Sequence, residues 1–175
     1  DRVLAAAGDE HPALRAKVHG FAGVAAFRRG AVDAADTHWR TMLALFEQLD
    51  DREGIARGLS DVGTAAAARG DWEESRALLE QAATAFRELG ERKRLAVVLG
   101  NLGHVAGHVG DFAGGIALTV EALELEREVG DKQRQAISLN NLGSFAAETG
   151  EHDEARRWLG ECAELSLEIG YREVI

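Results

Sequence analysis

The residues of this chain whose type and spacing suggest chemistry begin with two histidines. His104 and His108 are four positions apart, so on a helix their imidazoles lie one above the other. That spacing can bind zinc, but a closed site needs three or four ligands. The chain has no His-Glu-x-x-His string, and a third ligand would have to come from Asp61 or Glu148 on a neighbouring helix. We therefore expect no metal site and interpret both histidines as lining a groove.

Signatures of catalysis are also missing from the chain. It lacks the Gly-x-x-x-x-Gly-Lys-Ser/Thr phosphate loop and the Gly-x-Ser-x-Gly turn of serine hydrolases. Ser144 has no evident acid–base partner. Cys162 stands where equivalent segments carry Ala82 and Ala122, so we expect it to fill the core rather than act as a nucleophile. The sequence therefore predicts a non-catalytic chain that needs no cofactor.

Charge and composition exclude several classes of partner. The 175 residues include 20 Lys and Arg against 30 Asp and Glu, which gives a net charge of −10. Nucleic acids require a basic stripe and anionic membranes attract basic chains, so we expect neither as a partner. No run of 18 apolar residues is present to span a bilayer. A single cysteine excludes an intramolecular disulfide and favours a cytoplasmic location.

The elements that must position these residues recur every 40 residues. Within each period, apolar residues spaced by three and four predict two helices. One recurring glycine lies between the helices, where it can end a helix in the left-handed conformation, and aspartates such as Asp111 and Asp131 can cap the next helix. The other lies inside the first helix, where it predicts a close crossing with the second helix. The two columns are Gly30, Gly70, Gly110 and Gly150, and Gly23, Gly63, Gly103 and Gly143.

These features resemble the tetratricopeptide repeat (TPR) family. The resemblance covers nearly the whole chain, although the first unit matches more weakly than the others. Two departures are a spacing of 40 rather than about 34 residues and the absence of the proline that closes a unit. Both helices of each unit should therefore be about one turn longer. The matching residues of the third unit are Leu99, Leu102-Gly103, Ala106, Gly110, Phe112 and Ala122.

The resemblance implies an all-α fold, a right-handed α-solenoid or superhelix of TPR helix-turn-helix hairpins. We predict about four repeats plus partial terminal helices, which together form a single TPR solenoid fragment over residues 1–175. Residues 1–10 are interpreted as the end of a preceding helix and Tyr171 to Ile175 as the start of a following one, so we expect further repeats and domains outside this segment. The predicted repeats span about 14–54, 55–94, 95–134 and 135–175.

The resemblance also implies where a partner binds, namely in a concave groove formed by the first helices of the hairpins. Asn101 and Asn141 occupy a position where the family often uses asparagine to hold a partner's backbone, and a carboxamide can both donate to and accept from a peptide unit. Asp61 fills this position in the second unit and interrupts the row of asparagines. The alternative interpretation of Asn101 and Asn141 is that they are solvated polar residues on a helix face. The groove set is Lys17, Arg28, Arg57, Asp61, Thr64, Asn101, His104, His108, Asn140, Asn141 and Ser144.

Forty-residue TPRs resemble the regulatory arms of bacterial LuxR-type and maltose-regulator-type signal-transduction ATPases and transcriptional regulators, and also cell-polarity scaffolds that grip peptides. Arginine outnumbers lysine 17 to 3, a bias typical of GC-rich bacterial coding, which favours the first group. We therefore predict a protein- or peptide-binding scaffold, the sensing or docking segment of a larger bacterial regulator. Two alternatives stay open: a small-ligand (inducer) sensor, and self-association through exposed terminal helices.

Overall fold

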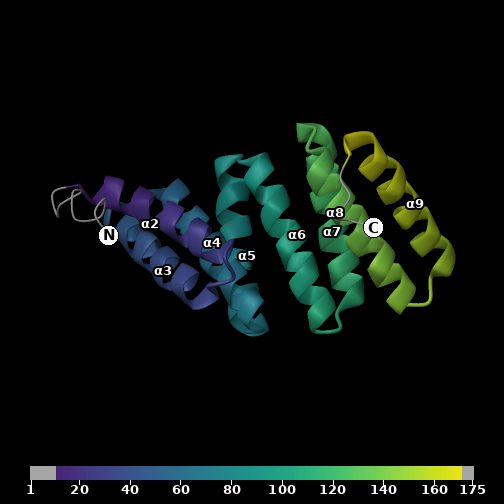
Figure 1. Cartoon of the computed structure of the whole chain (residues 1–175), viewed down its shortest axis with the longest axis horizontal. Helices are drawn as coiled ribbons and strands as arrows, with labels where there is room; N and C mark the ends of the chain where they lie inside the picture. Colours follow the sequence, from purple (N-terminus) through teal and green to yellow (C-terminus); the bar gives the residue numbers. More distant parts are fainter. Residues whose placement is uncertain (1–10, 171–175) are drawn as a thin grey trace. The chain divides into compact units, whose positions relative to one another are not determined.

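The computed structural model describes residues 11–170, which form eight α-helices and no strand (Figure 1). This architecture confirms the predicted all-α helical repeat fold. Residues 1–10 and 171–175, where the sequence predicts the ends of flanking helices, lie outside the described residues. The contacts between helices divide the chain into two compact units, Asp1–Leu89 (unit 1) and Gly90–Ile175 (unit 2).

Unit 1 consists of two helical hairpins. The first hairpin pairs α2 (Pro12–Phe27) with α3 (Val32–Gln48), and the second pairs α4 (Arg52–Arg69) with α5 (Trp72–Leu89). Because α3 also packs against α4, the two hairpins stack on each other. The buried contact surface is built from small residues and a few large ones. Its largest members are Trp39, Met42, Leu45, Phe46 and Val62.

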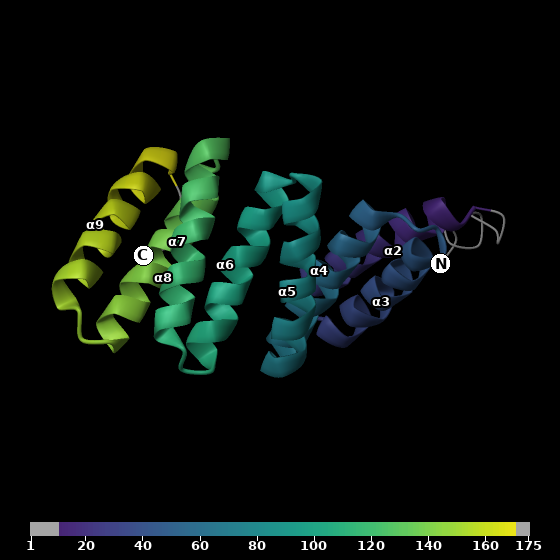
Figure 2. The same cartoon turned by 180° about the vertical axis from the view of Figure 1, so that it is seen from behind.

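Unit 2 repeats this arrangement. Its hairpins pair α6 (Arg92–His108) with α7 (Phe112–Val129), and α8 (Lys132–Glu148) with α9 (His152–Ile169). Figure 2 shows α8 between α7 and α9, and α8 packs against both of them. The core between these helices consists of Leu123, Ala136, Leu139, Leu142 and Cys162, which confirms the expected burial of the single cysteine.

The turns within the hairpins use the residues that the sequence indicates. Gly110 ends α6 with a φ of +81°, and the equivalent glycines of the other hairpins have φ values between +75° and +83°. The Asp111 carboxylate accepts a hydrogen bond of 2.9 Å from the Gly114 amide at the start of α7. Asp131 caps α8 in the same way, through the Arg134 amide at 3.1 Å. These caps satisfy amide groups that a helix start otherwise leaves unpaired.

The glycines inside the first helix of each hairpin mark close crossings, as predicted. A Cβ atom added at Gly103 would lie 2.3 Å from Thr119 Oγ1 and 3.1 Å from the Gly115 carbonyl oxygen of α7. At Gly23 it would lie 2.3 Å from the Trp39 indole nitrogen. The crossing at Gly103 therefore brings one helix backbone against another, whereas the one at Gly23 accommodates a large side chain.

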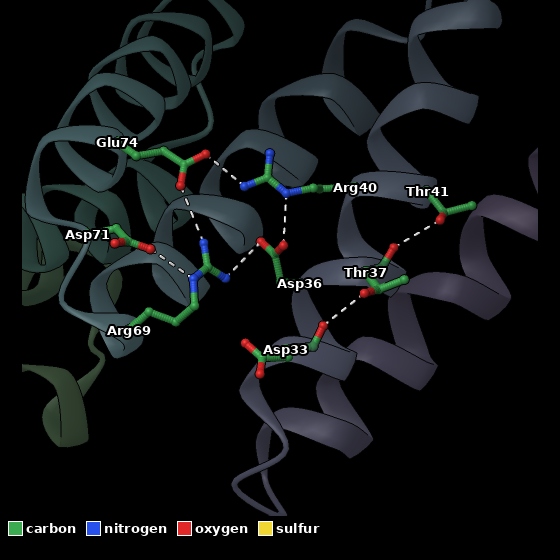
Figure 3. A network of polar contacts seen from close by, with 8 residues as sticks. All are labelled: Asp33, Asp36, Thr37, Arg40, Thr41, Arg69, Asp71 and Glu74. Carbon is green, nitrogen blue, oxygen red and sulfur yellow. Dashed lines mark hydrogen bonds and ion pairs between the residues drawn. The ribbon is translucent and has the colours of Figure 1, made fainter.

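A polar network ties three helices of unit 1 together (Figure 3). Arg69 at the end of α4 contacts Asp36 of α3 at 3.2 Å, Asp71 at 2.9 Å and Glu74 of α5 at 3.3 Å. Arg40 of α3 bridges Asp36 and Glu74 with distances of 2.8 and 2.7 Å. Because each guanidinium forms ion pairs with two or more carboxylates on different elements, the network fixes the end of α4 against α3 and the start of α5.

Candidate functional site

A pocket of about 270 Å³ lies within unit 2 and is lined by residues of α6, α7 and α8. Three of the predicted groove residues belong to this lining, namely Asn101 and His104 on α6 and Asn141 on α8. The two asparagines predicted to hold a partner's backbone thus share one cavity, hereafter the α6–α8 pocket. The other lining residues are Gly100, Glu126, Arg134, Ile137 and Ser138.

Glu126 is the buried acidic residue of this pocket, and sequence reasoning missed it, as it missed Arg134 and Ser138. Its side chain is only 2% exposed, and its Oε2 atom has no hydrogen-bond partner within the described residues. Burial raises the pKa of this carboxyl to about 7, although a hydrogen bond with Ser138 and the charge of Arg134 lower it, while the charge of Asp131 raises it further. Near neutral pH, Glu126 can therefore hold a proton or a negative charge.

The 40-residue period explains how this acidic pocket forms. The positions equivalent to Glu126 in the first two hairpins hold Phe46 and Phe86, both buried. In unit 1 the ring of Phe46 packs on Gly54, where an added Cβ would lie 2.3 Å from its Cγ atom. The position two periods after Gly54, which follows Glu126 by the same eight residues, holds Arg134. An aromatic–glycine contact is thus replaced by an acidic and a basic residue, and the glutamate at a phenylalanine position is the sequence signal that could have revealed the site.

His104 and His108 face each other along α6. Their Nε2 atoms are 3.1 Å apart, which requires one ring nitrogen to donate and the other to accept. Burial, with a smaller contribution from the charge of His108, lowers the pKa of His104. Within residues 11–170, no group of three or more His, Cys, Asp or Glu side chains is placed to hold a metal ion. The pair therefore presents hydrogen-bonding ring nitrogens on α6, and His104 belongs to the lining of the α6–α8 pocket.

The remaining predicted groove residues lie outside this pocket. On α8, the Ser144 hydroxyl donates to the Asn140 carbonyl at 3.0 Å. In unit 1, the Arg57 Nε atom lies 3.7 Å from Asp61 Oδ2 on the same helix. The Thr64 hydroxyl donates to the backbone of its own helix, at the Ser60 carbonyl. Two cations, Lys17 on α2 and Arg28 just after it, are exposed.

The chain also matches family models directly. Two models, each described as tetratricopeptide repeat, match residues 55–89 and 94–168. Together with the repeated hairpins and the left-handed glycines between them, these matches show that the chain belongs to the TPR family. No curated protein sequence matches it significantly.

Solved structures of similar fold share little sequence identity with this chain. BtubC (BKLC) from P. vanneervenii shares 17% identity with a TM-score of 0.81, covering 91% of this chain and 66% of that protein. Aspartyl phosphate phosphatase F from Bacillus subtilis shares 11% identity with a TM-score of 0.84, covering 91% of this chain and 42% of that one. A signal transduction ATPase with numerous domains and a TPR sensor, from Pyrococcus horikoshii, shares 18% identity with a TM-score of 0.77, at 91% and 25% coverage. The chain thus spans between a quarter and two-thirds of these proteins' lengths.

Membership of the family supplies a coarse function. TPR repeats are protein-interaction scaffolds, and the family is typically non-catalytic. No helix in the described part of the chain is long and apolar enough to cross a membrane.

Proposed function

We propose that this chain is a non-catalytic peptide-binding module and that the α6–α8 pocket is its recognition site. The observation that carries the proposal is the convergence of Asn101 and Asn141 on one cavity. Two carboxamides from neighbouring first helices can each donate to and accept from the backbone of an extended chain. A preformed wall of packed helices needs little ordering on binding, so most of the entropic cost falls on the peptide.

The proposed context is the sensing or docking segment of a larger bacterial regulator. Two observations support it: the excess of arginine over lysine, and the similar fold of the signal transduction ATPase whose TPR repeats are described as a sensor. A docking segment needs a surface that distinguishes one peptide from another. The buried, titratable Glu126 gives the α6–α8 pocket such a distinguishing feature, since a partner group must match its charge.

Selection from a random peptide library tests the proposal. Peptides that bind the whole chain are measured by fluorescence anisotropy against the wild type, the double variant Asn101→Ala/Asn141→Ala, and Gln133→Ala. The last variant is the matched control, because it removes an exposed carboxamide from α8 outside the pocket. Each lost hydrogen bond is worth about 1 kcal/mol, so we expect the double variant to bind about tenfold or more weakly and the control to bind normally.

Two results count against the proposed function. One is that no peptide binds the wild type above background. The other is that the selected peptides bind the double variant as tightly as the wild type, which would place recognition elsewhere on the chain.

A further inference from the structure

We infer that the α6–α8 pocket receives a primary ammonium group, the side chain of a lysine in the bound peptide, and that Glu126 is the residue that recognises it. This inference rests on the proposed function, because it names the part of the partner that enters the pocket. It extends that function from a grip on the peptide backbone, common to all sequences, to the selection of one side chain.

The first step is the state of the Glu126 carboxyl. Ser138 provides a hydrogen bond, whereas Oε2 has no partner within the described residues, although the side chain is 98% buried. A buried acceptor without a donor is destabilising, and an unpaired buried charge is more so. A group that donates to Oε2 would offset this cost, and a cation stabilises the ionised form best.

The second step is the geometry of the other acceptors. An ammonium group has three donors and no acceptor, so it needs three oxygen or nitrogen atoms around it. The lining includes Asn101 and Asn141 in addition to Glu126, and a carboxamide oxygen can accept a hydrogen bond from an ammonium group. His104, whose pKa is lowered, contributes a neutral imidazole rather than a competing charge. An incoming carboxylate, in contrast, would meet Glu126 with the same charge unless the pocket were protonated.

The third step concerns the charged groups that face Glu126. Arg134 on α8 attracts the carboxylate through its charge, and Asp131, which caps α8, partly opposes this effect. The balance leaves Glu126 with a pKa of about 7, so the protonated and the ionised forms are both accessible near neutral pH. A bound ammonium favours the ionised form, and its binding at pH 7 must therefore release part of a proton.

The chain as a whole assists a cationic partner. With a net charge of −10, it attracts basic peptides over distances beyond direct contact. Lysine can place its charge in a cavity of about 270 Å³, because its long apolar stem carries a compact ammonium at the tip.

The experiment uses a peptide that requires Asn101 and Asn141, from the selection described above. Each of its lysines is replaced in turn by norleucine, which keeps the apolar stem and removes the ammonium. Dissociation constants are measured with the wild type, Glu126→Gln and Glu128→Gln. The last is the matched control, an exposed glutamate on the same helix that pairs with Arg92.

We expect one norleucine replacement to weaken binding to the wild type and to the control about tenfold or more, and to have no further effect on Glu126→Gln. Calorimetry at pH 7 in two buffers of different ionisation enthalpy should show proton release for the wild type and none for Glu126→Gln.

Three results would overturn the inference while leaving the proposed function intact. The peptide requires the asparagines but contains no essential lysine; an arginine in place of the lysine binds more tightly; or Glu126→Gln binds as well as the wild type. If no peptide depends on the asparagines at all, the proposed function fails together with the inference.

Discussion

At the scale of single residues, the main feature of the molecule is a carboxyl group at a position that belongs to the hydrophobic core. Glu126 occupies the position of the 40-residue period at which the first two hairpins have Phe46 and Phe86. Its backbone carbonyl accepts hydrogen bonds from the Gln135 side chain and from the Asp131 amide in the turn before α8. The helices packed around this position leave Glu126 only 2% exposed. The carboxyl is therefore held in a low-dielectric site, and its raised pKa follows from that position.

This burial predicts a pH dependence of stability. Between pH 4.5 and about 7 the folded chain keeps the Glu126 proton that the unfolded chain loses, so the free energy of unfolding falls as the pH rises through this window. Each pH unit between the two pKa values corresponds to about 1.4 kcal/mol, so the loss reaches about 3 kcal/mol. Glu126→Gln lacks this titration and should be more stable than the wild type at pH 8 by up to that amount.

Urea unfolding of both proteins at pH 4.5 and pH 8 measures the effect. The difference in free energy of unfolding between the wild type and Glu126→Gln should be small at pH 4.5 and large at pH 8. If the free energies of unfolding of the wild type and Glu126→Gln changed with pH in parallel, that result would contradict the burial of an ionisable Glu126. Glu128→Gln, at an exposed position, serves as the control and should follow the wild type at both values.

A second residue-scale prediction concerns the turn between α3 and α4. Asp50 has a φ of +53° and is the non-glycine residue with a positive φ in the described chain, whereas Gly90, Gly130 and Gly170 hold the equivalent positions. The left-handed conformation costs a residue with a Cβ atom about 1–2 kcal/mol, partly offset by the greater unfolded-state entropy of glycine. Asp50→Gly should therefore raise the free energy of unfolding by about 0.5–1 kcal/mol. Thermal unfolding tests it, and the reciprocal Gly130→Asp should lower stability by a similar amount.

At the scale of the elements, the hairpins depend on the closeness with which their helices cross. Gly103 allows α6 to approach the backbone of α7 near Gly115, and the Thr119 hydroxyl donates to the Gly115 carbonyl at 2.7 Å within this contact. A side chain at Gly103 has no room unless the two helices separate. Since α6 also carries Asn101 and His104, a change in this crossing would move the wall of the α6–α8 pocket.

Gly103→Ala tests the crossing. In an unobstructed helix interior this substitution stabilises by about 1 kcal/mol, but here the new methyl group meets Thr119 and a backbone carbonyl, so we expect a net loss of about 1–3 kcal/mol. Gly160→Ala on α9 is the matched control, because nothing lies within 4 Å of an added Cβ there, and it should be neutral or stabilising. Equal effects of the two substitutions in urea unfolding would refute the close crossing.

The Arg69 network offers an electrostatic prediction for unit 1. Arg69→Met removes a guanidinium that joins α3, α4 and α5, and we expect it to lower stability by about 1 kcal/mol in dilute buffer. The loss should shrink in 1 M NaCl, because salt screens partly exposed ion pairs. Arg76→Met, whose partner Glu80 lies on the same helix, should cost less than about 0.5 kcal/mol. If 1 M NaCl left the stability loss of Arg69→Met unchanged, the loss would come from packing rather than from charge.

At the scale of the whole molecule, much of the fold could be predicted because it depends on short-range patterns. The 40-residue recurrence and glycines such as Gly110 encode hairpins through local geometry, and the structure contains those hairpins. The polar faces of the first helices are equally local, and two of their members, Asn101 and Asn141, do meet in one cavity.

The rest of the candidate site could not be predicted in the same way. Whether Glu126 points to solvent or into a pocket depends on which helices pack around α7, and its neighbours Arg134 and Ser138 come from α8. Arg57 and Asp61, in contrast, form an ion pair four residues apart on one helix, which follows from local spacing. The surroundings of Glu126 are decided by tertiary contacts and not by periodicity.

The central claim is that one peptide contacts both asparagines and Glu126 at the same time. The most direct test is a crystal structure of the chain bound to a selected peptide. It should show peptide backbone groups within hydrogen-bonding distance of Asn101 and Asn141 and a lysine ammonium within about 3 Å of the Glu126 carboxylate. A peptide bound on another face, with the α6–α8 pocket unoccupied, would contradict the claim.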